Sequence, residues 1–259
     1  MEANKIIITG GATRIGAAIA EKLSGPNVEM VIHYNKSKSE AEKLKKKLSL
    51  MGSKIYLIKG DLSKETDLNK IIKFAKNKLK YFYCLINNAS LFENDKIENF
   101  TSDSWGRHLR TNLRTPALLS KVFAKNTKSK NNNIINIIDQ RVFKLTPFFF
   151  SYTISKAGLY TLTKTSAMSL APNVRVNGIA PGPTLKNKRQ SDKHFKKQYL
   201  ATPLKKQVNV KEICNAIDFF IKNKSITGQV IAIDSGQSLN WQTPDVIGKE
   251  WRKKLLAII

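Results

Sequence analysis

The residue pair with the clearest chemical potential is a tyrosine followed four positions later by a lysine. Tyr152 and Lys156 stand at the start of a helical pattern, so this spacing puts both side chains on one helix face. A cation beside a phenol favours the tyrosinate, so we expect Lys156 to lower the pKa of Tyr152 from about 10. A phenol tuned in this way can act as an acid or base near neutral pH, and the pair therefore predicts proton-transfer chemistry.

A second chemical feature is the glycine-rich stretch TGGATRIG at residues 9–16, which joins an apolar run to a helical pattern. Small residues at such a turn let backbone N–H groups approach a pyrophosphate, and the helix N-terminus adds positive potential. We therefore expect a dinucleotide here, with Gly10, Arg14 and Ile15 among the residues that contact it.

The type of dinucleotide depends on the residues that follow the second predicted strand. An NAD-binding protein places an acidic residue there to bind the ribose hydroxyls. In this chain the stretch reads Tyr34, Asn35, Lys36 and Ser37, without an acid. A cation and a hydroxyl suit a 2′-phosphate, so the stretch favours NADPH over NADH. The alternative is that Lys36 is one more solvated lysine.

The chemistry-bearing residues must be positioned by a regular series of elements. Strand-like runs cover residues 5–9, 29–34, 54–60, 83–87, 133–138, 174–178 and 229–233. They are nearly all apolar, as in parallel strands that are buried on both faces. Helical patterns cover residues 15–23, 39–51, 64–79, 104–125 with a break near Pro116, 152–170 and 211–222. This alternation predicts an α/β fold, namely a Rossmann-like, doubly wound, seven-stranded, mostly parallel sheet with helices on both faces.

Two further motifs follow predicted strands. Asp61 and Leu62 come after the third strand, and Asn88 and Ala89 come after the fourth. Because open α/β sheets bind ligands at the carboxyl ends of their strands, we expect these residues at the same cleft.

Length and composition fit one folded domain. The chain has 259 residues, of which 41% are hydrophobic, and it contains neither a repeat nor a linker. We therefore treat residues 1–259 as a single domain. Residues 183–208 carry no clear strand pattern, and a lid over the strand ends is the role that we expect for them.

The net charge of +26 raises the question of a polyanionic partner. Only eight of the 45 basic residues are arginines, and the lysines are scattered over the polar faces of predicted helices. Compositional bias explains this charge, so we expect no specific nucleic-acid partner.

The sequence also bears on the compartment and on metals. No apolar run approaches the roughly 18 residues that a membrane span needs, and residues 1–5 lead directly into a strand pattern, without room for a signal peptide. We expect a soluble, cytoplasmic protein with reduced thiols at Cys84 and Cys214. The three histidines lack metal-ligand spacing, so we expect no metal.

These motifs together resemble the short-chain dehydrogenase/reductase family over essentially the whole chain. The matching residues, in the family's order, are TGGATRIG (9–16), GDL (60–62), NNA (87–89), Asn112, YTISK (152–156) and the pair Pro181–Gly182. The resemblance implies that Tyr152 donates a proton, while Lys156 lowers its pKa and holds the nicotinamide ribose. It further implies that Asn112 supports a water-linked proton relay.

The same resemblance assigns residues to the NADPH site. Asp61 would contact the adenine, and Asn88 would line the cofactor cleft. The remaining cofactor contacts that we expect are Leu62, Ala89, Ser90, Pro181 and Gly182.

Two departures from the general family pattern concern the substrate. The family usually has a serine thirteen residues before the tyrosine, where this chain has Asp139, and Arg14 replaces the middle glycine of the turn. Both resemble the pteridine reductase branch, which also carries a serine and an aromatic residue after NNA, as Ser90 and Phe92 do here. HYNKS (33–37) and DSGQSL (234–239) are similar to that branch and to its dihydromonapterin reductase relatives.

The resemblance therefore implies an enzyme that reduces a pterin with NADPH. The expected substrate is a dihydropterin, and dihydrofolate is a further candidate. Asp139 would relay a proton or bind the amino-pyrimidine edge, and Phe92 would stack on the flat ring. Arg14 would bridge the cofactor phosphate and the pterin oxygen, and Ser90 would contact the substrate. The alternatives involve no contact with the substrate. They are a core or lid role for Phe92, a contact with the cofactor phosphate alone for Arg14, and a strand-end cap at Asp139.

Two other functions stay open at this point. One is the reduction of an ordinary ketone, such as a 3-oxoacyl thioester or a sugar-like carbonyl. The other is a non-catalytic, nucleotide-sensing or polyanion-binding role on the same fold.

For assembly, the resemblance implies a homotetramer built on the helices at 104–125 and 152–170 and on the C-terminal strand. The apolar end of residues 251–259 would cover a neighbouring subunit or fold back on its own chain.

Overall fold

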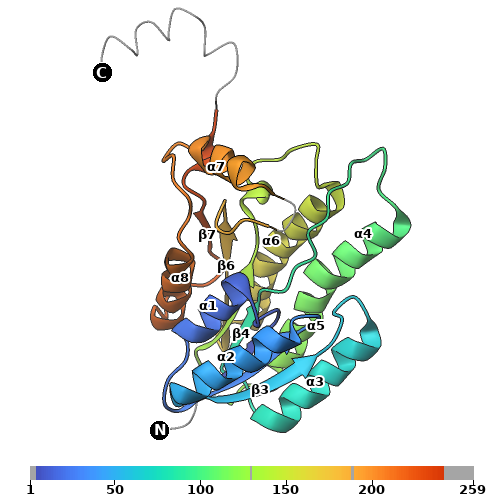
Figure 1. Ribbon diagram of the computed structural model, residues 1–259. Coiled ribbons are helices and arrows are strands. Elements are labelled where there is room, and N and C mark those ends of the chain that lie inside the picture. Colours follow the sequence, from blue (N-terminus) through green and yellow to red (C-terminus); the bar gives the residue numbers. More distant parts are fainter. Residues whose placement is uncertain (1–3, 129, 188–189, 242–259) are drawn as a thin grey trace, which may run out of the picture.

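The computed structural model describes residues 4–128, 130–187 and 190–241. Its centre is a seven-stranded sheet in the order β3-β2-β1-β4-β5-β6-β7, with every neighbouring pair parallel (Figure 1). From β1 the chain moves outward through β2 to β3, and from β4 it moves the other way through β5 and β6 to β7. The doubly wound sheet expected from the alternating pattern is therefore confirmed, and all of its strands are parallel.

All seven predicted strands are present, with ends that mostly differ by one residue. They are β1 (Asn4–Ile8), β2 (Val28–Tyr34), β3 (Lys54–Lys59), β4 (Cys84–Asn87), β5 (Asn132–Ile137), β6 (Val174–Pro181) and β7 (Val230–Ile233). The largest difference is at β6, which runs on to Pro181 because residues 178–181 pair with β7.

Apart from one in the 183–208 segment, the helices also follow the predicted pattern. They are α1 (Arg14–Lys22), α2 (Lys38–Leu50), α3 (Glu65–Leu79), α4 (Ser102–Leu109), α5 (Thr115–Ala124), α6 (Phe150–Leu170), α7 (Asp192–Leu200) and α8 (Val210–Lys222). The predicted break near Pro116 is a change of helix type rather than a gap, because a π-helical turn, η1 (Arg110–Arg114), joins α4 to α5. Pro116 comes just after this turn, where the π-helical bonding interrupts the regular α-helical pattern and accommodates a residue without an N–H.

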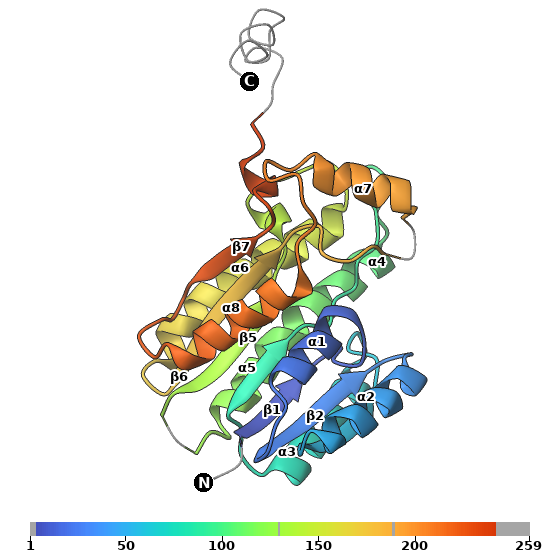
Figure 2. The same ribbon diagram turned by 60° about the vertical axis from the view of Figure 1, so that its left-hand side comes forward.

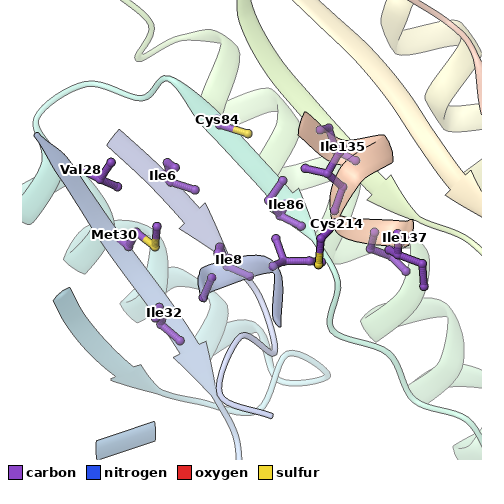
Figure 3. Packing of buried hydrophobic residues seen from close by; sticks show 14 of the residues in the cluster. Ile6, Ile8, Val28, Met30, Ile32, Cys84, Ile86, Ile135, Ile137 and Cys214 are labelled. Atoms are coloured by element: carbon purple, nitrogen blue, oxygen red, sulfur yellow. The ribbon is translucent and has the colours of Figure 1, made fainter. Parts of the chain in front are cut away.

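Alternate residues of each central strand face opposite helical layers. Ile6 and Ile8 of β1 pack in one buried cluster with residues of α1, α2 and α8, whereas Ile7 belongs to a second cluster with α3, α5 and α6. Figure 2 shows the two layers around the sheet. Figure 3 shows part of the first cluster, to which Cys214 of α8 also belongs. Burial of both faces explains why the strands read as continuous apolar runs.

The segment at 183–208 contains a helix that the sequence analysis did not identify. Helix α7 lies at one end of the molecule, beyond β6 and β7 (Figures 1 and 2). The Ser191 hydroxyl accepts a hydrogen bond from the backbone of His194 at 3.1 Å, and Asp192 is in the first turn. This serine–aspartate start is a signal that could have predicted the helix. None of the helices within the described residues is long and apolar enough to cross a membrane.

Candidate active site

The glycine-rich turn and the NNA motif meet where the chain reverses its direction of travel across the sheet. β1 and β4 are neighbours there, which opens the crevice in which doubly wound sheets bind ligands. The Thr9 hydroxyl accepts hydrogen bonds from the backbone of Asn88 at 3.0 Å and of Ala89 at 3.1 Å. The Asn88 amide in turn donates to the carbonyls of Thr9 and Gly10 at 3.0 and 2.9 Å. Asn88 therefore braces the turn from the neighbouring strand end.

Two glycines allow this close contact. Gly10 has φ 59°, and a Cβ there would lie 2.9 Å from the Ala89 Cα. A Cβ on Gly16 would lie 2.3 Å from the Gly10 carbonyl oxygen. Larger residues at either position would push the turn away from β4.

The start of α1 fits an anionic ligand. Its N-cap residue, Thr13, makes no capping hydrogen bond through its side chain, and the first turn contains no acid. The N–H groups of a first helical turn have no partners within the helix, and the helix dipole makes that end positive. These are the properties required to hold the phosphates of a dinucleotide.

Arg14, the first residue of α1, contacts the segment expected to act as a lid. It has φ 56°, and its guanidinium donates to the carbonyls of Lys186 at 2.7 Å and Leu185 at 2.9 Å. Ile15 follows in the same turn and is partly buried. The structure thus joins Arg14 to the 183–208 segment, a contact that the sequence did not predict.

A buried histidine that the sequence analysis did not place in the site organises the adjacent strand ends. The Gly10 N–H donates to His33 Nδ1 at 3.1 Å, so the other ring nitrogen, Nε2, carries the proton and donates to the Gly60 carbonyl at 3.0 Å. Burial lowers the pKa of His33, which keeps the ring neutral in this bridging role. The position of His33 at the end of a predicted strand did not indicate that it would bond to Gly10 and Gly60.

The remaining predicted cofactor residues lie along the same edge of the sheet. Tyr34 is buried, and Asn35 and Lys36 are exposed directly after it. Gly182 donates its N–H to the Ile233 carbonyl at 2.9 Å, just beyond Pro181 at the end of β6.

The pair Asp61 and Leu62 follows β3. Asp61 accepts hydrogen bonds from the backbone and hydroxyl of Ser63 at 2.9 and 2.8 Å. The Leu62 side chain is buried in the core, and its carbonyl accepts from Thr115 at 2.9 Å. Any contact of Leu62 with a cofactor therefore involves its backbone.

Tyr152 and Asp139 form the chemical centre of the site. The Tyr152 hydroxyl donates to Asp139 Oδ2 at 2.7 Å, and Asp139 Oδ1 accepts from the Arg141 backbone at 2.8 Å. Burial, followed by the charge and the hydrogen bond of Asp139, raises the pKa of Tyr152 well above 10, although Arg141 and a hydrogen bond with Ser90 act to lower it. The expected lowering of this pKa is therefore wrong, because burial of the phenol and the neighbouring Asp139 carboxylate both oppose its ionisation.

Lys156 lies one turn further along α6. Its Nζ donates to the Ile137 carbonyl at 2.7 Å and lies 5.8 Å from the centroid of the Tyr152 ring. The side chain is buried, and this burial lowers the pKa of Lys156 to about 8, against the opposing effect of Asp139. The cation is thus present at neutral pH and is lost in mildly alkaline solution.

Asn112 holds the loop that follows β4. It is fully buried in η1, and its amide exchanges two hydrogen bonds with the Leu91 backbone, at 2.8 and 2.9 Å. Its Nδ2 also donates to Ser155 at 3.0 Å. These contacts use both amide hydrogens, so Asn112 positions the residues after NNA, and its part in a water-linked relay stays a prediction.

The same loop carries Phe92 into the site, where it has two aromatic neighbours. Its ring stacks on Phe149, with centroids 4.5 Å apart and planes 3° apart, and meets Tyr152 edge-on at 4.6 Å. Arg141 lies 4.6 Å from the Phe149 centroid and 5.8 Å from that of Phe92. The sequence analysis missed Phe149 and Arg141, although the aromatic run at 148–150, directly before Tyr152, was a visible signal.

No metal centre accompanies these groups in the part of the chain that the structure describes. There, no group of three or more His, Cys, Asp or Glu residues is arranged to hold an ion. The chemistry that the site offers is proton transfer between a phenol, a carboxylate and an amine.

The fold and the Tyr152–Lys156 pair define a class of enzymes, and a family model agrees. The model described as "Enoyl-(Acyl carrier protein) reductase" matches residues 10–238. The chain belongs to the short-chain dehydrogenase/reductase family, whose members are oxidoreductases.

Individual relatives span nearly the whole chain. Dihydromonapterin reductase from Enterobacter sp. (strain 638) is 26% identical over 239 residues, which are 91% of this chain and 97% of the relative. The 3-oxoacyl-[acyl-carrier-protein] reductase FabG from Buchnera aphidicola subsp. Baizongia pistaciae (strain Bp) is 31% identical over 236 residues, with 89% and 95% covered.

A solved structure is more similar still. FolM alternative dihydrofolate reductase 1 from Brucella canis, complexed with NADP, is 40% identical with a TM-score of 0.89, and the match covers 94% of this chain and 97% of that one. Together with the dihydromonapterin reductase, it supports the predicted pteridine reductase-like branch.

Proposed function

We propose that this protein reduces a pterin with NADPH, converting a dihydropterin to a tetrahydropterin, with dihydrofolate as a further substrate. The observation that carries the proposal is the 2.7 Å hydrogen bond from Tyr152 to Asp139. It pairs a protonated phenol with a carboxylate at the end of β5, beside the Phe92 ring. The dihydromonapterin reductase and FolM relatives support the same substrate class.

The cofactor proposed is NADPH, which supplies a hydride when it is bound. The uncapped start of α1 would receive its phosphates, and Asn88 would hold the turn in place. Lys36 and Ser37 would bind the 2′-phosphate, because no acid follows β2 to bind free ribose hydroxyls. The NADP in the Brucella canis relative is consistent with this choice.

The proton would come from Tyr152. Reduction of a C=N bond adds a hydride to carbon and a proton to nitrogen, so the site must deliver a proton to a ring nitrogen. The raised pKa of Tyr152 keeps its hydroxyl protonated until that step. Lys156 would stabilise the tyrosinate that results, since its ammonium is the buried cation on the same helix face.

Asp139 would bind the edge of the pterin. A carboxylate accepts hydrogen bonds and donates none, which suits the N–H groups of an amino-pyrimidine edge. It also accepts the Tyr152 hydroxyl, so it can relay a proton between solvent and the phenol. Phe149 covers one face of Phe92, and the partly exposed Phe92 ring would stack on the flat ring of the pterin.

The second candidate function is reduction of a ketone such as a 3-oxoacyl thioester. The FabG relative from Buchnera aphidicola, at 31% identity, favours it. Asp139 argues against it, because an ionised carboxylate cannot donate a hydrogen bond to a substrate carbonyl as a serine can.

The test is the rate of NADPH oxidation with dihydromonapterin, 7,8-dihydrobiopterin, dihydrofolate and an acetoacetyl thioester, with NADH as the cofactor control. We expect turnover of the pterins with NADPH and little with the thioester. Turnover of the thioester alone would refute pterin reduction. Asp139→Ser is the matched variant, and a gain of thioester turnover in it would favour the ketone function.

The proposed assembly is a cytoplasmic homotetramer in contact through the α4–α5 and α6 helices and through β7. Sedimentation velocity of the purified chain would measure its mass. The tail at 251–259, which the sequence analysis expected to cover a neighbouring subunit or to fold back, lies outside the described residues.

A further inference from the structure

A cation and an aromatic ring, Arg141 and Phe149, lie beside the catalytic centre. Arg141 lies in η2 (Gln140–Val142), two residues after Asp139, and Phe149 immediately precedes α6. Both side chains are partly exposed. Neither contacts the reacting atoms in the reaction proposed above, but both contact Phe92, and the charge of Arg141 acts to lower the pKa of Tyr152.

The first observation is that the Arg141 guanidinium has only ring contacts. Within the described residues, no carboxylate, carbonyl or hydroxyl group bonds to it, and its neighbours are the rings of Phe149 and Phe92. By contrast, Arg107 pairs with Glu93 and Asp103. A guanidinium can donate two parallel hydrogen bonds to a carboxylate, and this one has its donors available.

The second observation is the order of the rings. Tyr152 contacts Phe92 at 4.6 Å, and Phe92 stacks on Phe149 at 4.5 Å. Arg141 lies beside this stacked pair rather than behind it, because a group behind Phe149 would be much farther than 5.8 Å from the Phe92 centroid. An apolar wall therefore leads from the reacting hydroxyl to a free cation.

We infer that Phe149 and Arg141 form a subsite for the tail of a folate-type substrate, namely an aromatic ring followed by carboxylates. The ring would pack against Phe149, and a carboxylate would pair with Arg141. A dihydropterin with a short, neutral side chain would not reach this subsite. The inference rests on the proposed function, because it assumes that the pterin ring binds between Asp139 and Phe92.

The charge of the whole chain agrees with an anionic substrate. A net charge of +26 attracts anions from solution, and a cation beside the catalytic centre directs that attraction locally.

The loop geometry around Arg141 does not depend on its side chain, because its backbone N–H is the group that bonds to Asp139. Substitution of Arg141 should therefore leave the catalytic pair intact.

The experiment compares dihydrofolate with dihydromonapterin in the wild type, Arg141→Gln and Lys96→Gln. Lys96 is the matched control, because it is a cation 4.8 Å from the ring of the neighbouring Phe148 and its loss changes the net charge equally. In Arg141→Gln we expect kcat/KM for dihydrofolate to fall at least about tenfold more than kcat/KM for dihydromonapterin, because any change in the pKa of Tyr152 affects both substrates equally. Lys96→Gln should change neither value by more than about twofold.

A second variant and a binding measurement make the outcome decisive. Phe149→Leu should also weaken dihydrofolate selectively, and calorimetry should show the loss as weaker dihydrofolate binding. Equal losses for both substrates in Arg141→Gln, or unchanged kinetics, would overturn the subsite. Absence of turnover of either substrate by the wild type would instead refute the proposed function, and the calorimetry would still test the subsite.

Discussion

The surroundings of Tyr152 determine which form of its phenol is stable. Burial and the Asp139 carboxylate raise its pKa, so the hydroxyl is protonated before the transfer, although the same shift makes it a weaker acid. The buried Lys156 ammonium then becomes important after transfer, when a tyrosinate beside a carboxylate would otherwise be unfavourable. Asp139 and Lys156 thus favour the phenol before the transfer and the tyrosinate after it.

This arrangement predicts a large effect of Tyr152→Phe. The variant removes the proton to be transferred but keeps the ring that packs on Phe92, so kcat should fall at least about 10²-fold. NADPH affinity, measured by fluorescence titration, should change by less than about threefold. Tyr160→Phe, which removes a phenol from the same helix, is the control and should retain activity. An unchanged rate in Tyr152→Phe would contradict the assigned proton donor.

The pKa of Lys156 predicts a pH dependence. Burial lowers it to about 8, so the side chain is charged below that pH and neutral above it. If the cation stabilises the tyrosinate, kcat/KM for the dihydropterin should decline as the pH rises through about 8. The pH profile of Lys156→Arg is the check, because an arginine stays charged and should move the decline upward. A decline at the same pH in both proteins would assign it to another group.

At the scale of elements, helix α6 receives its N-terminal cap from a distant loop. Phe149, at the N-cap position, has φ 57° and caps nothing with its own side chain. Instead, Asn94 accepts from the Phe149 backbone at 3.2 Å, and the Asp95 carboxylate accepts from that of Ser151 at 3.0 Å. The loop after β4 therefore positions the helix that carries Tyr152.

Loss of this cap should weaken both stability and catalysis. Asp95→Ala should lower the free energy of unfolding by about 1 kcal/mol, measured in urea, and reduce kcat several-fold. Asp95→Asn keeps an acceptor oxygen and should retain most of both. Glu40→Ala, in the exposed first turn of α2, is the control and should change stability by less than about 0.5 kcal/mol. A stable and fully active Asp95→Ala would show that α6 does not need this cap.

At the scale of the whole molecule, the net charge of +26 should produce only non-specific attraction to polyanions. Affinity for a labelled DNA duplex, measured by anisotropy, should fall about 10³-fold between 50 and 200 mM salt, if six or more lysines contact phosphates. An unrelated duplex should give the same values. Tight binding of one duplex that persists at the higher salt concentration would instead revive a nucleic-acid function.

The sequence by itself determined the fold and the chemical class. Seven apolar runs alternating with helical patterns predict a doubly wound sheet, because parallel strands buried on both faces read as apolar runs and helices connect them. Tyr152, Lys156, Asp139 and the turn at 9–16 were identifiable because their spacing along the chain is local or belongs to a family's ordered motifs.

Tertiary structure decided which groups act on one another. The direction of the Tyr152 pKa shift depends on Asp139, thirteen residues away, and on burial, neither of which local spacing reveals. The contacts of His33 with Gly10 and Gly60, and of Arg14 with residues 185–186, arise between segments remote in sequence. Electrostatics and hydrogen bonding act across a few ångströms of space, so those consequences follow only once the chain has folded.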